Sequence, residues 1–269
     1  MNIHPVQVGP VTIGGPDLVL IAGPCVIESR AATLDIAHRL ADITAALNLP
    51  LVFKASFDKA NRSSIAAYRG PGLDAGLEVL AAVGAATGLP LTTDVHHPHQ
   101  AAAIAAVVDL LQVPAFLCRQ TDLLVACAET GRPVNVKKGQ FMAPQAMGAV
   151  VDKLRVSGAS GVVLTERGTS FGHGDLVVDY RGLPILRGLG APVCMDATHA
   201  CQQPPTGGAS TGGLRDMVPT LARAAVAVGI DALFLEVHPD PDRAPCDGSN
   251  MLPLAELDGL LRGLLALRG

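Results

Sequence analysis

Residues 18–57 read LVLIAGPCVIESRAATLDIAHRLADITAALNLPLVFKASF, and this stretch decides the fold class. Two apolar runs, 18–25 and 49–57, enclose an Ala/Leu-rich segment at 31–47 that follows Ser29, a residue type favoured at helix N-caps. Continuous apolar runs of this length are typical of strands buried on both faces of a parallel sheet. The stretch therefore predicts a strand–helix–strand unit.

The same pattern repeats along the chain. It predicts eight strands, at 18–25, 49–57, 89–96, 107–113, 133–139, 161–168, 191–199 and 232–239. It predicts helices at 31–47, 73–87, 98–106, 122–130, 144–156, 179–188, 214–228 and 253–267, of which 179–188 has the weakest pattern. Eight such units in 269 residues fit an α/β protein of the closed (β/α)8 TIM barrel type. An open doubly wound sheet is the alternative, but no GxGxxG motif follows the first strand.

The N-terminal residues 5–14, PVQVGPVTIG, alternate around Gly-Pro and predict a β-hairpin that caps the bottom of the barrel. No linker or low-complexity segment interrupts the pattern. We therefore expect residues 1–269 to form a single barrel domain.

The composition excludes several function classes. Hydrophobic residues make up 49% and charged residues 16%, which excludes a disordered chain. The net charge of −4 without basic runs argues against nucleic-acid and anionic-membrane partners. The sequence contains no apolar run long enough for a transmembrane helix and no signal-peptide pattern. We expect a cytoplasmic protein whose six cysteines are mostly reduced.

Cations gather where the predicted strands end, which is where (β/α)8 enzymes build their active sites. Four of the five lysines lie there, namely Lys54, Lys59, Lys137 and Lys138. Arg62, Ser63 and Arg167 lie in the same kind of position. Converging cations predict an anionic ligand, typically phosphate or carboxylate. The alternative for each cation alone is an ion pair with an acidic neighbour such as Asp58, Asp94 or Glu166.

A second group of strand-end residues could bind a divalent metal ion. Cys25 ends the first predicted strand, His199 the seventh and Glu236 the eighth, and Asp247 lies in the loop after the eighth. These strands are neighbours in a closed barrel, so one thiol, one imidazole and two carboxylates could converge. Each residue also has an ordinary structural explanation, such as a core cysteine or a turn aspartate. His96 is a further candidate, whereas adjacent His97 should point to the opposite face.

Nine motifs resemble a known enzyme family over the chain from about residue 10 to its end. They are GPC at 23–25, FKASFDKANRSS at 53–64, TDVH at 93–96, QVPAFLCRQTDLL at 112–124, NVKKGQFMAP at 135–144, TERGTSFG at 165–172, DATHACQQP at 196–204, LEVHPDPDRAPCDG at 235–248 and LPL at 252–254. The sequence resembles the 3-deoxy-D-manno-octulosonate 8-phosphate synthases, also called 2-dehydro-3-deoxyphosphooctonate aldolases. The resemblance implies a transferase that condenses phosphoenolpyruvate with D-arabinose 5-phosphate and water. The products are 3-deoxy-D-manno-octulosonate 8-phosphate, used for lipopolysaccharide, and inorganic phosphate.

The resemblance also implies a role for each matching residue and a homotetrameric assembly. Lys59, Lys137, Arg167 and Gln112, with Lys54 nearby, would surround phosphoenolpyruvate. Asn61, Arg62 and Ser63 would hold arabinose 5-phosphate, and Phe116 and Arg119 would reach a neighbouring subunit's site. Cys25, His199, Glu236 and Asp247 match the ligands of the metal-dependent class, for which Zn, Fe(II), Mn or Co is expected. Lys59, Lys137, Asp94, His96 and His199 are the candidates for catalytic groups.

The sequence departs from the family pattern at two places. His173-Gly174-Asp175 stands where relatives have Tyr-Asn-Asn, and Cys246 before Asp247 is associated more with the metal-independent class. Two alternative functions stay open. One is the related 3-deoxy-D-arabino-heptulosonate 7-phosphate synthase, which uses erythrose 4-phosphate but has Lys-Pro-Arg where this chain has Lys-Ala-Asn-Arg. The other is a non-catalytic sugar-phosphate-binding barrel.

Overall fold

Eight parallel strands form a closed barrel in the computed structural model, which describes residues 3–62, 64–173, 175–203 and 212–268. The strands are β3 (Val19–Gly23), β4 (Leu51–Lys54), β5 (Leu91–Asp94), β6 (Leu110–Val113), β7 (Val134–Lys137), β8 (Val162–Glu166), β9 (Val193–Asp196) and β12 (Ala232–His238). Each pairs with the next, and β12 pairs with both β3 and β9, which closes the ring. The predicted TIM barrel and all eight predicted strands are confirmed.

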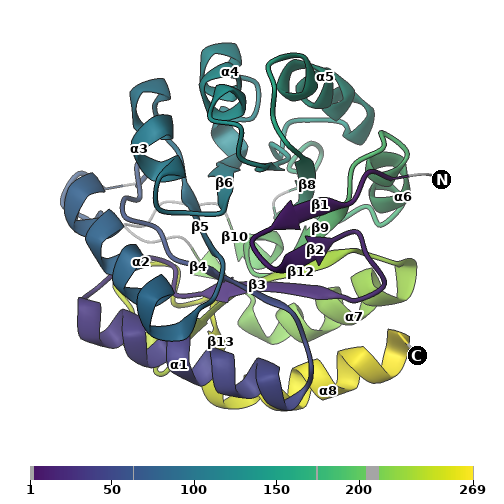
Figure 1. The fold of residues 1–269 in the computed structure, drawn as a ribbon. Helices are drawn as coiled ribbons and strands as arrows, with labels where there is room; N and C mark the ends of the chain where they lie inside the picture. The colour runs from purple at the N-terminus through teal and green to yellow at the C-terminus, as the bar shows by residue number, and fades with distance from the viewer. Residues whose placement is uncertain (1–2, 63, 174, 204–211, 269) are drawn as a thin grey trace.

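Helices surround the barrel on its outside (Figure 1). They are α1 (Arg30–Ala46), α2 (Leu73–Thr87), α3 (Ala101–Ala105), α4 (Thr121–Glu129), α5 (Gly148–Val156), α6 (Gly182–Arg187), α7 (Val218–Val228) and α8 (Leu257–Arg268). Four of them follow directly on a 3-10 turn, at Pro98–Gln100, Pro144–Met147, Arg215–Met217 and Leu254–Glu256. The weak pattern at 179–188 corresponds to the short helix α6.

Helix α1 shows how the local sequence sets an element. The Ser29 side chain accepts a hydrogen bond from the Ala32 backbone N–H at 3.2 Å, as its N-cap position predicts. Ile36, Ala37 and Leu40 follow at helical spacing and are buried against the barrel. The helix therefore covers the β3–β4 side of the sheet with one apolar face.

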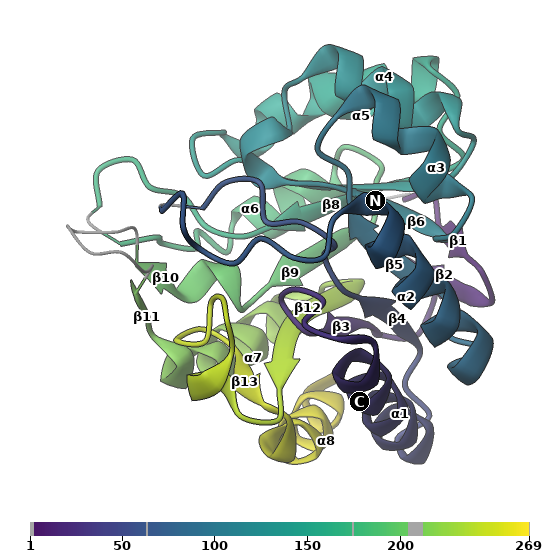
Figure 2. The same ribbon diagram turned by 90° about the vertical axis from the view of Figure 1, so that its left-hand side faces the viewer.

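The predicted N-terminal hairpin is present as β1 (Val6–Val8) and β2 (Val11–Ile13). Its alternate residues, Val6, Val8, Val11 and Ile13, are buried in one cluster with the first residues of several barrel strands, among them Val19, Leu110 and Ala232. The hairpin therefore closes the N-terminal end of the barrel, and it lies on the right in Figure 2.

Three short strands lie at the opposite end of the barrel and were not predicted. β10 (Gln202–Gln203) pairs with β11 (Gly212–Gly213), and β13 (Leu252–Pro253) adds to the end of β12. Figure 2 shows β10 and β11 on the left, away from the hairpin. No helix within the described part of the chain has the length and apolar character needed to cross a membrane.

Candidate active site

A cavity of about 860 Å³ opens at the C-terminal ends of the barrel strands. Most of the residues predicted for the site line it, namely Lys54, Lys59, Asn61, Arg62, Asp94, His96, Phe116, Lys137, Arg167, His199, Glu236 and Asp247. Ser63 and Gly174 lie outside the described residues. Arg119 is exposed and does not line the cavity. Cys25 and Gln112 are buried behind the residues that line the cavity.

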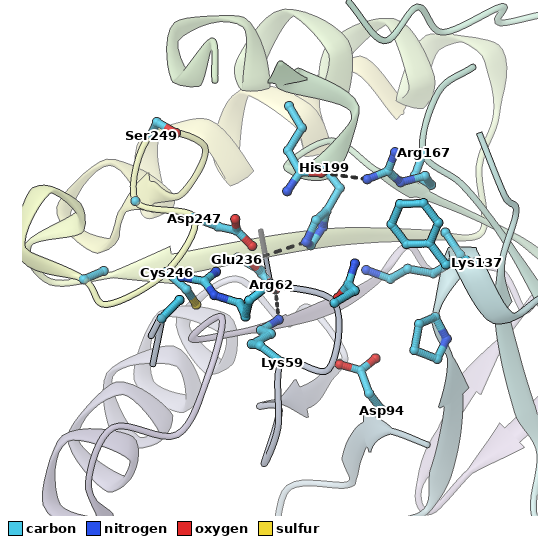
Figure 3. A pocket seen from close by; sticks show the side chains of 18 of the residues that line it. Lys59, Arg62, Asp94, Lys137, Arg167, His199, Glu236, Cys246, Asp247 and Ser249 are labelled. Atoms are coloured by element: carbon cyan, nitrogen blue, oxygen red, sulfur yellow. Dashed lines mark hydrogen bonds and ion pairs between the residues drawn. The ribbon is translucent and has the colours of Figure 1, made fainter. Parts of the chain in front are cut away.

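Glu236 stands at the centre of a charged cluster on this cavity (Figure 3). Its Oε1 lies 2.6 Å from Lys54 Nζ and 3.7 Å from Lys59 Nζ. Burial alone would raise the pKa of Glu236, yet Lys54, Lys59 and His199 hold it well below its ordinary value. Its Oε2 has no hydrogen-bond partner among the described residues, and His199 Nε2 lies 3.7 Å from it. A buried carboxylate oxygen without a hydrogen-bond partner is available to coordinate a metal ion.

Asp196, the last residue of β9, joins two of the predicted site residues. Its Oδ2 lies 2.6 Å from Lys137 Nζ and 2.8 Å from His199 Nδ1, and its Oδ1 accepts the His199 backbone N–H at 2.9 Å. Burial opposes the charge, but His199 and Lys137 lower the pKa of Asp196. Lys137 Nζ also lies 3.6 Å from the ring centroid of buried Phe234. The carboxylate thus fixes Lys137 and leaves His199 Nε2 facing the cavity.

Asp94, at the end of β5, terminates a buried hydrogen-bonded chain. Ser56 Oγ donates to its Oδ2 at 2.5 Å, and Gln112 Nε2 donates to its Oδ1 at 2.7 Å. Gln112 Oε1 accepts from Asn135 at 3.1 Å, and Asn135 Oδ1 accepts from Thr165 at 2.7 Å. Burial would raise the pKa of Asp94, but Lys54, Lys59 and His96 lower it. Asp94 is therefore a carboxylate that accepts hydrogen bonds, and both ends of the Gln112 amide are engaged beneath the cavity.

Lys59 and His96 differ in charge although both are largely buried. Burial disfavours the ammonium of Lys59, but Cys25 and Glu236 raise its pKa well above the ordinary value. Burial lowers the pKa of His96, which Asp94 only partly offsets. His96 is thus mainly neutral at physiological pH, and its Nδ1 has no hydrogen-bond partner among the described residues.

Two arginines reach the cavity from opposite sides. Arg167 donates from Nη2 to Gln202 Oε1 at 2.8 Å, and Arg62 donates from Nη2 to the Pro245 carbonyl at 3.2 Å. Figure 3 shows both guanidinium groups on the cavity, Arg62 beside Cys246 and Arg167 beyond His199. Together with the lysines, they give the cavity the cationic lining that the sequence predicted.

Lys138 does not converge with the other three lysines. Its Nζ is fully buried 3.3 Å from Glu166 Oε1 and donates to the carbonyls of Met142 and Gly168 at 3.3 and 3.2 Å. It therefore tethers the loops after β7 and β8 behind the cavity. The expectation that four lysines share one site is wrong for this residue, because it points to the opposite side of the chain from Lys137.

Two groups of metal-binding side chains share Asp247. His199, Glu236 and Asp247 each offer a ligand atom within 4.8 Å of the others, and so do Cys25, Cys246 and Asp247. Cys25 Sγ donates to Asp247 Oδ2 at 3.4 Å, and Asp247 has a left-handed backbone with φ of 48°. Burial, the neighbouring Cys246 and negative Glu236 raise the pKa of the Cys25 thiol. The four predicted ligands are thus divided between two neighbouring groups that Asp247 joins, and the sulfur, nitrogen and oxygen donors of these groups fit a divalent metal ion.

Sequence reasoning missed some residues that shape this site. Asp196 was visible as the first residue of the DATH motif, and Cys246 as the neighbour of Asp247, but neither had a role assigned from the sequence. Ser56 and Gln202 carried no sequence signal apart from their place inside longer motifs. Their contacts with Asp94 and Arg167 become visible only in the folded chain.

Comparison with known proteins agrees with the motifs and the geometry. The model of the DAHP synthetase I family matches residues 3–265. A 2-dehydro-3-deoxyphosphooctonate aldolase of Trichlorobacter lovleyi is 57% identical over 97% of this chain and 96% of its own length. Proteins with the same name from Nitrobacter winogradskyi and Syntrophotalea carbinolica are 59% and 55% identical, over 97% of this chain and 92% and 95% of theirs. The chain therefore belongs to the DAHP synthetase I family, and these three relatives are named 2-dehydro-3-deoxyphosphooctonate aldolases.

Proposed function

We propose that this protein is a 3-deoxy-8-phosphooctulonate synthase, a transferase that condenses phosphoenolpyruvate, D-arabinose 5-phosphate and water. The observation that carries the proposal is a cavity at the barrel mouth in which three lysines and two arginines face a buried histidine–carboxylate group. The full-length similarity to enzymes of that name supports the same reaction.

The cationic residues bind the two anionic substrates. Phosphoenolpyruvate carries a carboxylate and a phosphate, for which Lys59, Lys137 and Arg167 supply converging positive charge. Asn61 and Arg62 lie on the same cavity and would receive the sugar phosphate, Asn61 with an amide for a sugar hydroxyl and Arg62 with a guanidinium for the phosphate. Holding both substrates in one cavity supplies the near-attack pose that the bimolecular step needs.

The bonds that change define what the protein must do. The methylene carbon of phosphoenolpyruvate forms a bond with the sugar aldehyde carbon, and the aldehyde oxygen takes up a proton. Water attacks the second carbon of phosphoenolpyruvate and loses both of its protons, while the bond from that carbon to the phosphate oxygen breaks and inorganic phosphate leaves. In the overall balance, one proton of water replaces the one taken up by the aldehyde oxygen and the other leaves with the phosphate. The Lys59 ammonium, whose raised pKa keeps it charged, would stabilise the negative charge that develops on the aldehyde oxygen. Nδ1 of neutral His96, which has no hydrogen-bond partner among the described residues, would accept a proton from the attacking water. Through its negative charge, the Asp94 carboxylate offsets part of the effect of burial on the pKa of His96 and helps to raise the pKa of Lys59. Because its own pKa is lowered, Asp94 does not serve as a proton donor.

The proposed cofactor is a divalent metal ion held by Cys25, His199, Glu236 and Asp247. The unpartnered Glu236 Oε2 and the mixed sulfur, nitrogen and oxygen donors support it, and such donors suit Zn, Fe(II), Mn or Co. When bound, the ion would polarise the aldehyde oxygen or orient the attacking water. The chain's own contribution is to fix the ligands, through Asp196 on His199 and Lys54 on Glu236.

We also propose that the protein acts as a homotetramer in the cytoplasm. Phe116 supports a subunit contact, because its ring is 54% exposed at the rim of the cavity. Light scattering of the purified protein tests the assembly, and a monomer of 27.6 kDa would contradict it.

The reaction is tested by phosphate release from phosphoenolpyruvate with either arabinose 5-phosphate or erythrose 4-phosphate. We expect turnover with the five-carbon sugar, loss of turnover after EDTA and recovery with metal. Turnover with the four-carbon sugar alone would mean the related heptulosonate synthase, and binding without turnover would mean a sugar-phosphate-binding barrel. Activity that survives thorough chelation would support the proposed reaction but contradict the proposed metal cofactor.

A further inference from the structure

Cys246 lies beside two of the predicted metal ligands, Cys25 and Asp247. It is 4% exposed, lines the cavity, and is a free thiol close to Cys25. The two sulfurs and an oxygen of Asp247 lie within 4.8 Å of one another. Two thiolates that share one zinc-sized ion, with metal–sulfur bonds of about 2.3 Å, stand about 3.8 Å apart. The spacing therefore suits a shared ion.

The loop that carries Cys246 and Asp247 is fixed on both sides by arginines. Arg62 Nη2 donates to the carbonyl of Pro245, directly before Cys246, and Arg215 Nη2 donates to the carbonyl of Gly248, directly after Asp247. Gly248 is itself required, since a Cβ at that position would lie 2.2 Å from the Pro241 carbonyl oxygen. These contacts restrain the loop that carries Cys246 and Asp247.

The backbone of this loop turns both side chains toward the same corner. Neighbouring side chains of an extended chain point to opposite sides. Asp247 instead has a positive φ of 48°, which is costly for a residue with a side chain and is typical of functional positions. As a result Cys246 and Asp247 both reach the corner occupied by Cys25, and Figure 3 shows Asp247 between Cys246 on one side and Glu236 and His199 on the other.

We propose that Cys246 is a second sulfur ligand of the metal ion in this chain, in addition to Cys25. The inference rests on the proposed metal site but not on the identity of the reaction. A site with two thiolates prefers thiophilic ions such as Zn and Co, whereas one with a single thiolate and several oxygens accepts Mn more readily. Cys246 would thus be a residue that determines which metal the protein takes.

The competing explanation is that Cys246 is only a packing residue. It belongs to a small buried apolar cluster with Cys25, Val26 and Met251. If Cys246 only packs, the bound ion has one sulfur neighbour, from Cys25. If Cys246 is a ligand, the ion has two. Counting the sulfur neighbours of the bound ion therefore separates the two explanations.

The first experiment needs no substitution. The purified protein is loaded with Zn, and X-ray absorption at the metal edge counts the sulfur neighbours. We expect two sulfurs at about 2.3 Å. A fit with one sulfur, or with nitrogen and oxygen only, overturns the proposal. Turnover is measured separately on the same preparation, so a failed sulfur count and a failed reaction are recognised independently.

The second experiment uses Co(II), whose thiolate bonds give a charge-transfer band that grows with the number of bound sulfurs. Cys246→Ser should lose roughly half of the band, Cys25→Ser a similar share, and the double variant all of it, because each removes one of two thiolates. Cys127→Ser is the matched control, since Cys127 is a buried free cysteine on α4 outside the cavity, and it should keep the full band. A full band in Cys246→Ser with none in Cys25→Ser would refute the assignment. Circular dichroism verifies that each variant is folded.

Discussion

Replacing Asp196 with asparagine should break the hydrogen-bonded link between Lys137 and His199. Asp196 accepts hydrogen bonds from three donors, Lys137 Nζ at 2.6 Å, His199 Nδ1 at 2.8 Å and the His199 backbone N–H at 2.9 Å. An asparagine of the same shape has one acceptor oxygen and an NH2 group. In either orientation the NH2 group faces N–H donors, and Lys137 loses its counter-ion.

The expected magnitudes follow from burial and from the hydrogen bond on the ring. Both partners are buried, Asp196 at 0% and Lys137 at 6% exposure, and breaking such a pair costs about 3–5 kcal/mol of unfolding free energy. The Phe234 ring, 3.6 Å from Lys137 Nζ, offsets a fraction of that loss. Loss of the acceptor that orients a metal-binding histidine typically weakens metal affinity roughly 10–100-fold. Asp196→Asn should therefore lower the unfolding free energy, the metal affinity and kcat.

Three measurements test this prediction together. Denaturant unfolding gives the stability, competition with a chelator gives the metal affinity, and steady-state kinetics gives kcat and KM for phosphoenolpyruvate. Asp179→Asn is the control, because Asp179 pairs with Arg181 on the exposed surface, where such pairs contribute less than about 1 kcal/mol. Asp196→Asn with wild-type stability and metal affinity would refute the coupling. A loss of stability with unchanged metal affinity would show that Asp196 pairs with Lys137 but does not orient His199 for metal binding.

Three further predictions concern the lysine, the hairpin and pH. Lys137→Ala should lower kcat/KM for phosphoenolpyruvate about 10²–10³-fold, because it removes a fixed cation from the site; unchanged kinetics would exclude it from catalysis. Ile13→Ala should cost about 2–5 kcal/mol of unfolding free energy by opening a void in the barrel plug, and denaturant titration showing no loss would contradict the packing. The folded-state pKa values of Asp94, Asp196 and Glu236 lie below their unfolded values, so their stabilisation is present above about pH 4 and is lost as pH falls toward the folded values. Unfolding free energies that stay flat from neutral pH to pH 3 would argue against these pairs.

The fold was predictable because burial on both faces leaves a strong trace in the sequence. Every residue of β3, β4 and β8 is buried, and each appears as an unbroken apolar run with polar residues only at its end. The hairpin was predictable because β1 and β2 alternate between buried and exposed residues. The strands β10, β11 and β13 were not, because two residues carry no periodicity and their pairing depends on loops brought together by the barrel.

The sequence predicted which residues at the strand ends belong to the site, but not which of them form hydrogen bonds or ion pairs with one another. Lys137 and Lys138 are adjacent, and the alternation of side chains already implied that only one could face the cavity. The same argument correctly separates His96, which lines the cavity, from His97, which does not. The bond between Asp196 and Lys137 joins residues 59 positions apart, so no local pattern could reveal it.

The charges of the folded site explain why a metal ion suits this chemistry. Lys54, Lys59 and Lys137 are already balanced by the buried carboxylates Asp94, Asp196 and Glu236. The two arginines therefore supply the excess positive charge, and Asp247 cancels part of it. Two phosphate groups, each with about −1.5 to −2 charges, and a carboxylate exceed what the arginines can offset. A divalent ion on Asp247 would place a compact positive centre where this carboxylate meets Glu236 and His199. Each thiolate that binds the ion cancels one of its two charges, so the ion would act on the substrate through its local field rather than through the net charge of the site. Substrate affinity should accordingly rise with metal loading even in a variant that cannot turn over, and calorimetric titration of phosphoenolpyruvate into metal-free and metal-loaded Lys59→Ala protein would reveal it; equal affinities would show that the lysines and arginines suffice.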